Sequence, residues 1–278
     1  MVSSESSAQA WTTTAHTYGS NVARPSAVSA ARLVALASAL TPITPASAIL
    51  DNGAGTGAVT LHVAQNAPDT AITASDISEG MLRAINQHGL RNVRTMTADA
   101  QALRRAFRAG EFSHVFCTFM LQTITTPRTA VEEMLAVLRP GGVVGIAIWG
   151  QRNGPFEVWE RACRRLDPSY TLPTPFDDPH AWRTQAELET ALRVSGCVDV
   201  YSEEHTASFP FESPEAFARF WFEAQNPATV KCMSNWNGDM GEARQMVLEV
   251  CREEFRGGKD VKTWAVLGVG MKPVASQP

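Results

Sequence analysis

The sequence predicts an α/β fold in which helices cover both faces of a doubly wound parallel sheet. Short apolar runs alternate with stretches of helical spacing between residues 48 and 149, which is typical of strand-helix-strand crossovers. A glycine-rich turn directly follows the first apolar run. With 278 residues, the chain is long enough for about two domains of roughly 150 residues, or for one large domain with insertions.

Apolar residues recur at helical spacing from Pro25 to Leu40, and the prolines of Thr41–Pro45 end that helix. Five short strands are predicted after it: Ser47–Asp51, Ala71–Ser75, Val93–Thr97, His114–Phe119 and Val143–Trp149. Helices are expected between them, first after the glycine turn, where apolar residues run from Val59 to Ala64, and then at Glu79–Gln87, Gln101–Arg108 and Pro127–Leu138. Ser78 is the expected N-cap of the helix that starts at Glu79.

The pattern changes after Gly150, where prolines and aromatic residues punctuate a helical insertion. A helix is predicted at Glu187–Val194, and two late strands, Val198–Phe211 and Val261–Lys272, are expected to return to the sheet edge. They would complete a seven-stranded, Rossmann-like sheet. Between them we expect a helical lid of two helices, Pro214–Ala224 and Gly241–Phe255, joined by a turn at residues 236–238.

Composition excludes several classes of protein. The formal net charge is -4 and the pI about 5.9, so the chain lacks the cationic field that nucleic-acid binding usually needs. No apolar run approaches the roughly 20 residues of a membrane span, and the N-terminus does not resemble a signal peptide. The five cysteines are scattered and form no C-x-x-C pair. We therefore expect a cytoplasmic protein with reduced thiols and neither a nucleic-acid nor a membrane partner.

The glycine turn reads Asp-Asn-Gly-Ala-Gly-Thr-Gly and carries Gly53, Gly55 and Gly57. Glycines lack the Cβ that would block a ligand at the backbone, and the helix that follows offers unpaired N–H groups. A tight turn that binds nothing also uses glycine. A NAD(P)-dependent oxidoreductase is a further alternative, because Gly53, Gly55 and Ala58 fit its G-x-G-x-x-G/A pattern and Asp76 lies 19 residues beyond Gly57.

Carboxylates around the turn argue against a dinucleotide. Asp51 precedes the first glycine by two residues, where it would repel a pyrophosphate and attract a cation. S-adenosylmethionine is a sulfonium nucleoside without phosphate. Asp76, at the tip of the second strand, is expected to accept the ribose hydroxyls, and Asp99, at the tip of the third, the adenine amino group. The backbone N–H of Ala100 would contact the adenine ring.

At these residues the chain resembles the class I S-adenosylmethionine-dependent methyltransferases. The resemblance spans about Ala48–Trp149 in five blocks: residues 49–57, residues 72–78 with Met81, residues 97–100, residues 112–122 and residues 138–142. It is greatest for the small-molecule branch around the ubiquinone and menaquinone methyltransferases. Asn52 departs from that branch and is typical of fungal secondary-metabolism relatives.

The resemblance implies that S-adenosyl-L-methionine is the cofactor and S-adenosyl-L-homocysteine the product. The cofactor-binding residues that it implies are the acids and glycines above and four more positions: Ile77, Met81, Cys117 and Thr118. Methyl transfer would be an in-line displacement that depends mainly on positioning and desolvation. No metal is expected, since Thr118 and Phe119 stand where metal-dependent relatives have acids.

The expected catalytic residues come from three places. Phe119 and Gln122 follow the fourth strand, Trp149 ends the fifth, and Tyr18 belongs to an N-terminal segment that resembles the part of this branch that folds over the methyl donor. Gln122 stands where related quinone methyltransferases often have a histidine. The two histidines on the predicted core helices, His62 and His88, are expected to be structural or solvated.

Aromatic residues outside the core favour a small, partly aromatic acceptor. The specific hypothesis is S-methylation of a reduced epidithiodioxopiperazine of the gliotoxin type, since a thiol needs little help to ionise. The alternatives are O- or N-methylation of an aromatic metabolite, the oxidoreductase, and a non-methylating donor-binding protein or cyclase. The oligomeric state stays open. The expected segments are 1–46 (helical or lid), 47–150 (cofactor-binding core), 151–212 (insertion and late strand), 213–256 (substrate lid) and 257–278 (final strand and tail).

Overall fold

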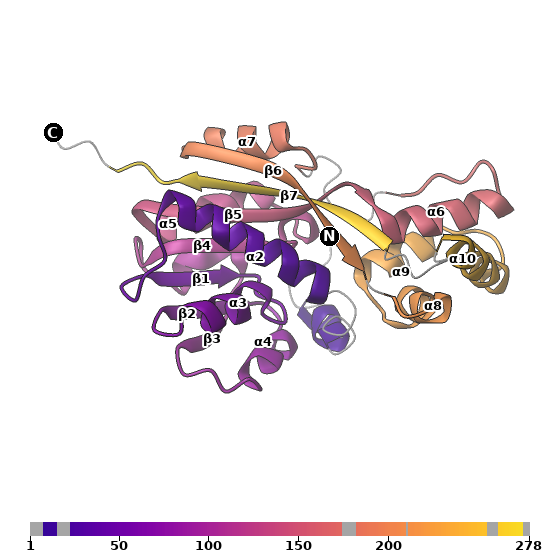
Figure 1. The fold of residues 1–278 in the computed structure, drawn as a ribbon, viewed down its shortest axis with the longest axis horizontal. Coiled ribbons are helices and arrows are strands. Elements are labelled where there is room, and N and C mark those ends of the chain that lie inside the picture. Colours follow the sequence, from indigo (N-terminus) through magenta and orange to yellow (C-terminus); the bar gives the residue numbers. More distant parts are fainter. Residues whose placement is uncertain (1–7, 16–22, 174–181, 210, 255–260, 275–278) are drawn as a thin grey trace.

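A computed structural model describes residues 8–15, 23–173, 182–209, 211–254 and 261–274. One seven-stranded sheet forms the centre of the molecule, with the strand order β3-β2-β1-β4-β5-β7-β6 (Figure 1). The strands are β1 (Ala48–Asn52), β2 (Ala71–Asp76), β3 (Val93–Thr97), β4 (Phe112–Thr118), β5 (Leu138–Asn153), β6 (Val198–Phe209) and β7 (Val261–Met271). The predicted α/β class and the seven-stranded sheet are confirmed.

The first five strands pair in parallel, whereas β7 pairs antiparallel with both β5 and β6. Both late strands return to the sheet as predicted, with β7 inserted next to β5 and β6 left at the edge. The carboxyl ends of β1, β2, β3 and β4 therefore point the same way, and this is the edge where open α/β sheets bind ligands.

Helices cover both faces of the sheet. The helical elements are α2 (Ala23–Leu40), α3 (Ala58–Asn66), α4 (Glu79–Asn86), η1 (Ala100–Arg105), η2 (Leu121–Thr123), α5 (Pro127–Val137), α6 (Gly154–Leu166), α7 (Gln185–Val194), α8 (Pro214–Glu223), α9 (Pro227–Ser234) and α10 (Met240–Glu254). Apolar side chains of α2 and α3 pack in one buried cluster, and those of η1, α5 and α7 pack in another on the opposite face. Among the described residues, no helix has the length and apolar content to cross a membrane.

Local sequence signals explain most of the helix starts. Ser78 caps α4 as predicted, its Oγ accepting a hydrogen bond of 3.2 Å from the N–H of Met81. Thr184 and Glu187 form a capping box at the start of α7, which begins two residues before the prediction. The cap therefore fixes that boundary better than apolar spacing does.

Two helical segments differ from the prediction. The helix expected at 101–108 is instead the short 3₁₀ segment η1, and its turn is interrupted at Ala102 (φ −148°). The lid contains a further helix, α9, which the sequence analysis did not predict. Asn226 and Pro227 are a cap and first-turn pair, and the Asn226 side chain accepts from the N–H of Ala228. This pair is the signal by which α9 could have been found.

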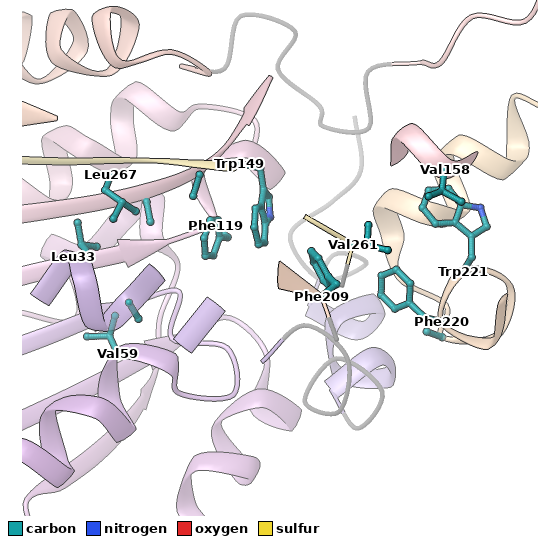
Figure 2. Packing of buried hydrophobic residues seen from close by; sticks show 14 of the residues in the cluster. Leu33, Val59, Phe119, Trp149, Val158, Phe209, Phe220, Trp221, Val261 and Leu267 are labelled. Carbon is teal, nitrogen blue, oxygen red and sulfur yellow. The ribbon is translucent and has the colours of Figure 1, made fainter. Parts of the chain in front are cut away.

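The helices α6, α8, α9 and α10 gather beyond the end of the sheet to which the β1 arrow points (Figure 1). Buried aromatic rings hold this group together, since Trp159 of α6 stacks on Trp221 of α8 with 5.5 Å between ring centroids. The buried apolar cluster continues from the sheet into these helices through Trp149, Phe209 and Phe220 (Figure 2). All five cysteines are buried and free, as the prediction of reduced thiols requires.

Candidate functional site

The glycine turn joins β1 to α3 and is tied to the neighbouring strand. The N–H groups of Gly53 and Ala54 both donate to the carbonyl of Ser75 at 2.8 and 2.9 Å. A Cβ on Gly53 would lie only 2.7 Å from Cγ of Met120, so this glycine is required by packing within the protein. Gly55 differs, because it has a positive φ of 54° and a Cβ there would meet nothing within 4 Å. Of these two glycines, only Gly55 has free space where a Cβ would stand.

Asp76 connects this turn to the start of α4. Its Oδ2 accepts from the N–H of Gly55 and its Oδ1 from the N–H of Ser78, both at 2.9 Å. Burial raises the pKa of Asp76, although backbone N–H groups of Ser78, Gly55 and Ile77 oppose that shift by favouring the charged form. Each carboxylate oxygen can accept more than one hydrogen bond, so Asp76 retains capacity for a ligand hydroxyl.

Asp51 has a different place from the one expected. Its side chain is fully buried, and Oδ2 accepts from both the N–H and the Oγ of Thr60, at 2.9 and 2.6 Å. The carboxylate therefore caps α3 and does not project into an open loop. Burial raises the pKa of Asp51 to about 6, so the group is still mostly ionised at pH 7. Oδ1 has no hydrogen-bond partner among the described residues.

Asp99 and Met81 also hold local structure. The Oδ1 of Asp99 accepts from the N–H of Gln101 at 2.9 Å and so caps η1, which starts at Ala100. Met81 is buried in the first turn of α4, beyond Ser78 and next to the Asp76–Ile77 turn. These residues lie at the tips of β2 and β3, on the same edge of the sheet as the glycine turn.

A cavity of about 240 Å³ lies against the glycine turn. Its walls come from the start of α2, the turn, one face of α3 and the residues after β4: Ser26, Ala27, Gly53–Ala58, Leu61, His62, Gln65, Thr118 and Phe119. Five of the predicted site residues thus meet at one cavity: Gly53, Gly55, Gly57, Thr118 and Phe119. The other described site residues lie outside its walls, and Tyr18 lies outside the described residues.

Cys117 is the clearest departure among the expected cofactor contacts. Its thiol is fully buried in the apolar cluster with Leu121 and Val144, and burial raises its pKa far above the ordinary value. Adjacent strand residues face opposite sides of a sheet, so Thr118 reaches the cavity while Cys117 does not. The side chain of Cys117 therefore packs the core.

Phe119, directly after β4, and Trp149, within β5, form a stacked pair. Their rings stack with centroids 3.7 Å apart and planes at 14°, and Figure 2 shows them face to face. Phe119 has a φ of 58°, which is rare for a residue with a side chain. Its N–H donates to the carbonyl of Ala147 at 2.7 Å, which holds the strained conformation in place.

Gln122 holds this pair from behind. Its Nε2 donates to the carbonyl of Trp149 at 2.8 Å, and the N–H of Trp149 donates to its Oε1 at 2.7 Å. Both ends of a buried amide are thereby engaged with backbone. The sequence analysis expected Gln122 among the reacting groups, but this geometry makes it a positioning residue for Trp149.

The polar residues of the cavity wall include four that are not among the predicted site residues: Ser26, Thr56, His62 and Gln65. His62 shares one face of α3 with Ala58, Leu61 and Gln65, all of which line the cavity. Spacing of three and four residues on a helix is the signal that could have placed them together. Burial lowers the pKa of His62, which favours a neutral imidazole at pH 7.

Comparisons with known proteins agree with this geometry. Residues 49–142 match the family model described as a methyltransferase domain. A malonyl-acyl-carrier-protein O-methyltransferase of Geobacter sulfurreducens is 32% identical over 165 residues, which are 58% of this chain and 60% of that enzyme. The methyltransferase tpcH of Aspergillus fumigatus is 25% identical over 257 residues, or 81% of this chain and 84% of that protein. The solved structure of the cyclase SpnF has a TM-score of 0.53 at 21% identity and covers 88% of this chain and 82% of that one.

The residues present fit S-adenosylmethionine. Open space borders Gly55, Asp76 keeps acceptor capacity beside it, and the cavity-lining residues include no lysine or arginine that would suit a pyrophosphate. The matched residues contain the glycine turn, the Asp76 turn and the tip of β4. Residues 49–142 therefore match a methyltransferase domain, and their geometry fits S-adenosylmethionine as the cofactor.

Proposed function

We propose that this chain transfers the methyl group of S-adenosylmethionine to a small-molecule acceptor. The observation that carries the proposal is the charge around the glycine turn. The ionised Asp51 is buried next to the turn, Asp76 accepts a hydrogen bond from Gly55, and no lysine or arginine lines the cavity. A buried carboxylate acts through a low dielectric and favours a cationic ligand over an anionic one. When bound, the cofactor supplies a methyl group on a sulfonium. A nucleophile bonds to the methyl carbon, and S-adenosylhomocysteine is the leaving group.

The proposed roles of the chain's residues follow from their positions. Asp76 accepts the ribose hydroxyls and Asp99 the adenine amino group, while the N–H of Ala100 contacts the ring. Thr118 and Phe119 border the reacting end of the cavity. The Phe119–Trp149 stack excludes water from that end, which favours displacement at carbon because the nucleophile loses its hydration shell.

We further propose a thiol as the acceptor, in a reduced epidithiodioxopiperazine. The ring of Phe119, which lines the cavity and is backed by Trp149, supports a partly aromatic acceptor. His62 is the one titratable side chain among the residues lining the cavity, so an acceptor that ionises with little help fits best. O- or N-methylation of an aromatic metabolite is the alternative outcome.

Methyl-labelled S-adenosylmethionine with a panel of dithiols, phenols and amines tests both levels of the proposal. We expect label on sulfur. Label on oxygen or nitrogen alone ends the thiol proposal but keeps the methyltransferase. Tight binding of the cofactor with no transfer to any acceptor favours a non-methylating role.

A variant and a rival ligand test the cofactor directly. Asp76→Ala is expected to weaken S-adenosylhomocysteine binding by about tenfold or more, since it removes hydrogen bonds to a charged group. Calorimetry with NAD provides the contrast. Tight binding of NAD with none of S-adenosylhomocysteine would identify an oxidoreductase and end the proposal.

A further inference from the structure

The donor's amino-acid tail carries a carboxylate, and the acidic residues of the site cannot bind it. In the roles proposed above, Asp76 binds the ribose hydroxyls, Asp99 binds the adenine amino group, and Asp51 favours the positive charge of the sulfonium. A carboxylate needs hydrogen-bond donors in a region free of other anions. The cavity-lining residues contain neither an acid nor a lysine or arginine, so neutral donors are the available partners.

Ser26 is such a donor. It lies in the first turns of α2, its side chain is only 4% exposed, and it lines the cavity with Ala27. Its Oγ has no hydrogen-bond partner among the described residues. A buried hydroxyl without a partner costs free energy, and a ligand oxygen would remove that cost.

The start of α2 adds a favourable field. This helix has 18 residues, and its first turn contains no acidic side chain. The amino end of a helix carries partial positive charge, and here nothing on the helix itself compensates it. Because Ser26 and Ala27 both line the cavity, that end of α2 lies beside the space that a ligand would occupy.

His62 lies on α3, which packs against α2 and forms another wall of the same cavity. The side-chain amide of Asn66 donates to the carbonyl of His62 at 2.8 Å, and its nitrogen lies 3.5 Å from Nδ1. A donor at Nδ1 favours the tautomer with the proton on Nε2. His62, which lines the cavity, then carries an N–H donor at Nε2.

We infer that Ser26 and His62, at the amino end of α2, form an anion subsite that binds the carboxylate of the donor's amino-acid tail. This inference rests on the proposed function, because it concerns the same ligand. It assigns to Ser26 and His62 a part in cofactor affinity that the acidic residues cannot supply.

The test compares S-adenosylhomocysteine with its decarboxylated analogue, in which hydrogen replaces the carboxylate, by calorimetry on the full chain. Ser26→Ala and His62→Gln should each weaken S-adenosylhomocysteine binding by about five- to tenfold and leave affinity for the analogue unchanged within twofold. Two matched controls are available. Ser29→Ala removes another buried hydroxyl without a partner, one turn along α2 and outside the cavity walls, and His88→Gln removes an exposed histidine. Neither control should change the ratio of the affinities for S-adenosylhomocysteine and its decarboxylated analogue.

The possible outcomes separate the two levels of the argument. If both variants bind the two ligands with wild-type affinities, or weaken both equally, the subsite is wrong while the proposed cofactor stands. If the wild-type chain binds no S-adenosylhomocysteine, the proposed function fails and the subsite fails with it.

Discussion

At the scale of single residues, Asp51 shows a cost in stability at the centre of the site. Its carboxylate is fully buried, and only one of its oxygens has a partner among the described residues. The folded pKa of about 6 exceeds the unfolded value near 3.9, so the free energy of unfolding falls as pH rises from about 4 to about 6. Above pH 6 the full cost is present.

Asp51→Asn removes the charge and keeps an oxygen for Thr60. We expect the free energy of unfolding of the variant to exceed that of the wild type by roughly 1–3 kcal/mol at pH 7.5. A shift of about two pKa units corresponds to about 3 kcal/mol at most. The gain should shrink toward zero as pH falls to 4, and binding of S-adenosylmethionine should weaken. Urea titrations at several pH values measure the free energy of unfolding, and Asp69→Asn, at an exposed position, is the control. A gain that is independent of pH would contradict this account.

At the scale of elements, the tips of β4 and β5 depend on one side chain. Gln122 makes two hydrogen bonds with the backbone of Trp149, and Trp149 stacks on the strained Phe119. Gln122→Leu leaves two buried backbone groups without these partners. We expect a loss of about 2–4 kcal/mol in the free energy of unfolding and a lower kcat, because Phe119 loses its fixed partner.

The control for this prediction is Gln65→Ala, an exposed glutamine at the cavity wall. It should leave the free energy of unfolding within about 0.5 kcal/mol of the wild type. Affinity of Gln122→Leu for S-adenosylhomocysteine should stay within about threefold of the wild type. A large loss of affinity with an unchanged kcat would mean that Gln122 acts on the cofactor rather than on Trp149.

Elements that the sequence predicts well are those defined by local signals. Val93–Thr97 has the predicted bounds, and Ser78 caps α4 as expected, since both depend on residues close in the chain. The position of Asp51 was mistaken because its burial depends on how α3 packs on β1. Ser26 and His62 were not paired for the same reason: their common cavity exists only once α2 lies against α3.

At the scale of the whole molecule, the helical segment 8–15 joins the sheet core to the helices beyond the end of the sheet, which are α6, α8, α9 and α10. Its Thr12 hydroxyl lies 2.9 Å from Oγ of Ser78, the cap beside Asp76, and its Thr14 hydroxyl donates to the carbonyl of Gln225 at 3.2 Å, just before α9. A Cβ on Gly80 would lie 2.9 Å from Cα of Thr12. Backbone cannot yield as a side-chain tip can, so Gly80 permits this contact.

Gly80→Ala sets two effects against each other. Alanine is favoured over glycine inside a helix by about 1 kcal/mol, so α4 alone would gain stability. The clash instead displaces segment 8–15 and disturbs Ser78, which donates its N–H to Asp76. We expect S-adenosylhomocysteine affinity to fall several-fold and amide exchange in residues 8–15 to accelerate. Gly241→Ala, in α10 and close only to the Asp239 side chain, should change neither. Unchanged exchange in Gly80→Ala would show that segment 8–15 does not depend on this contact.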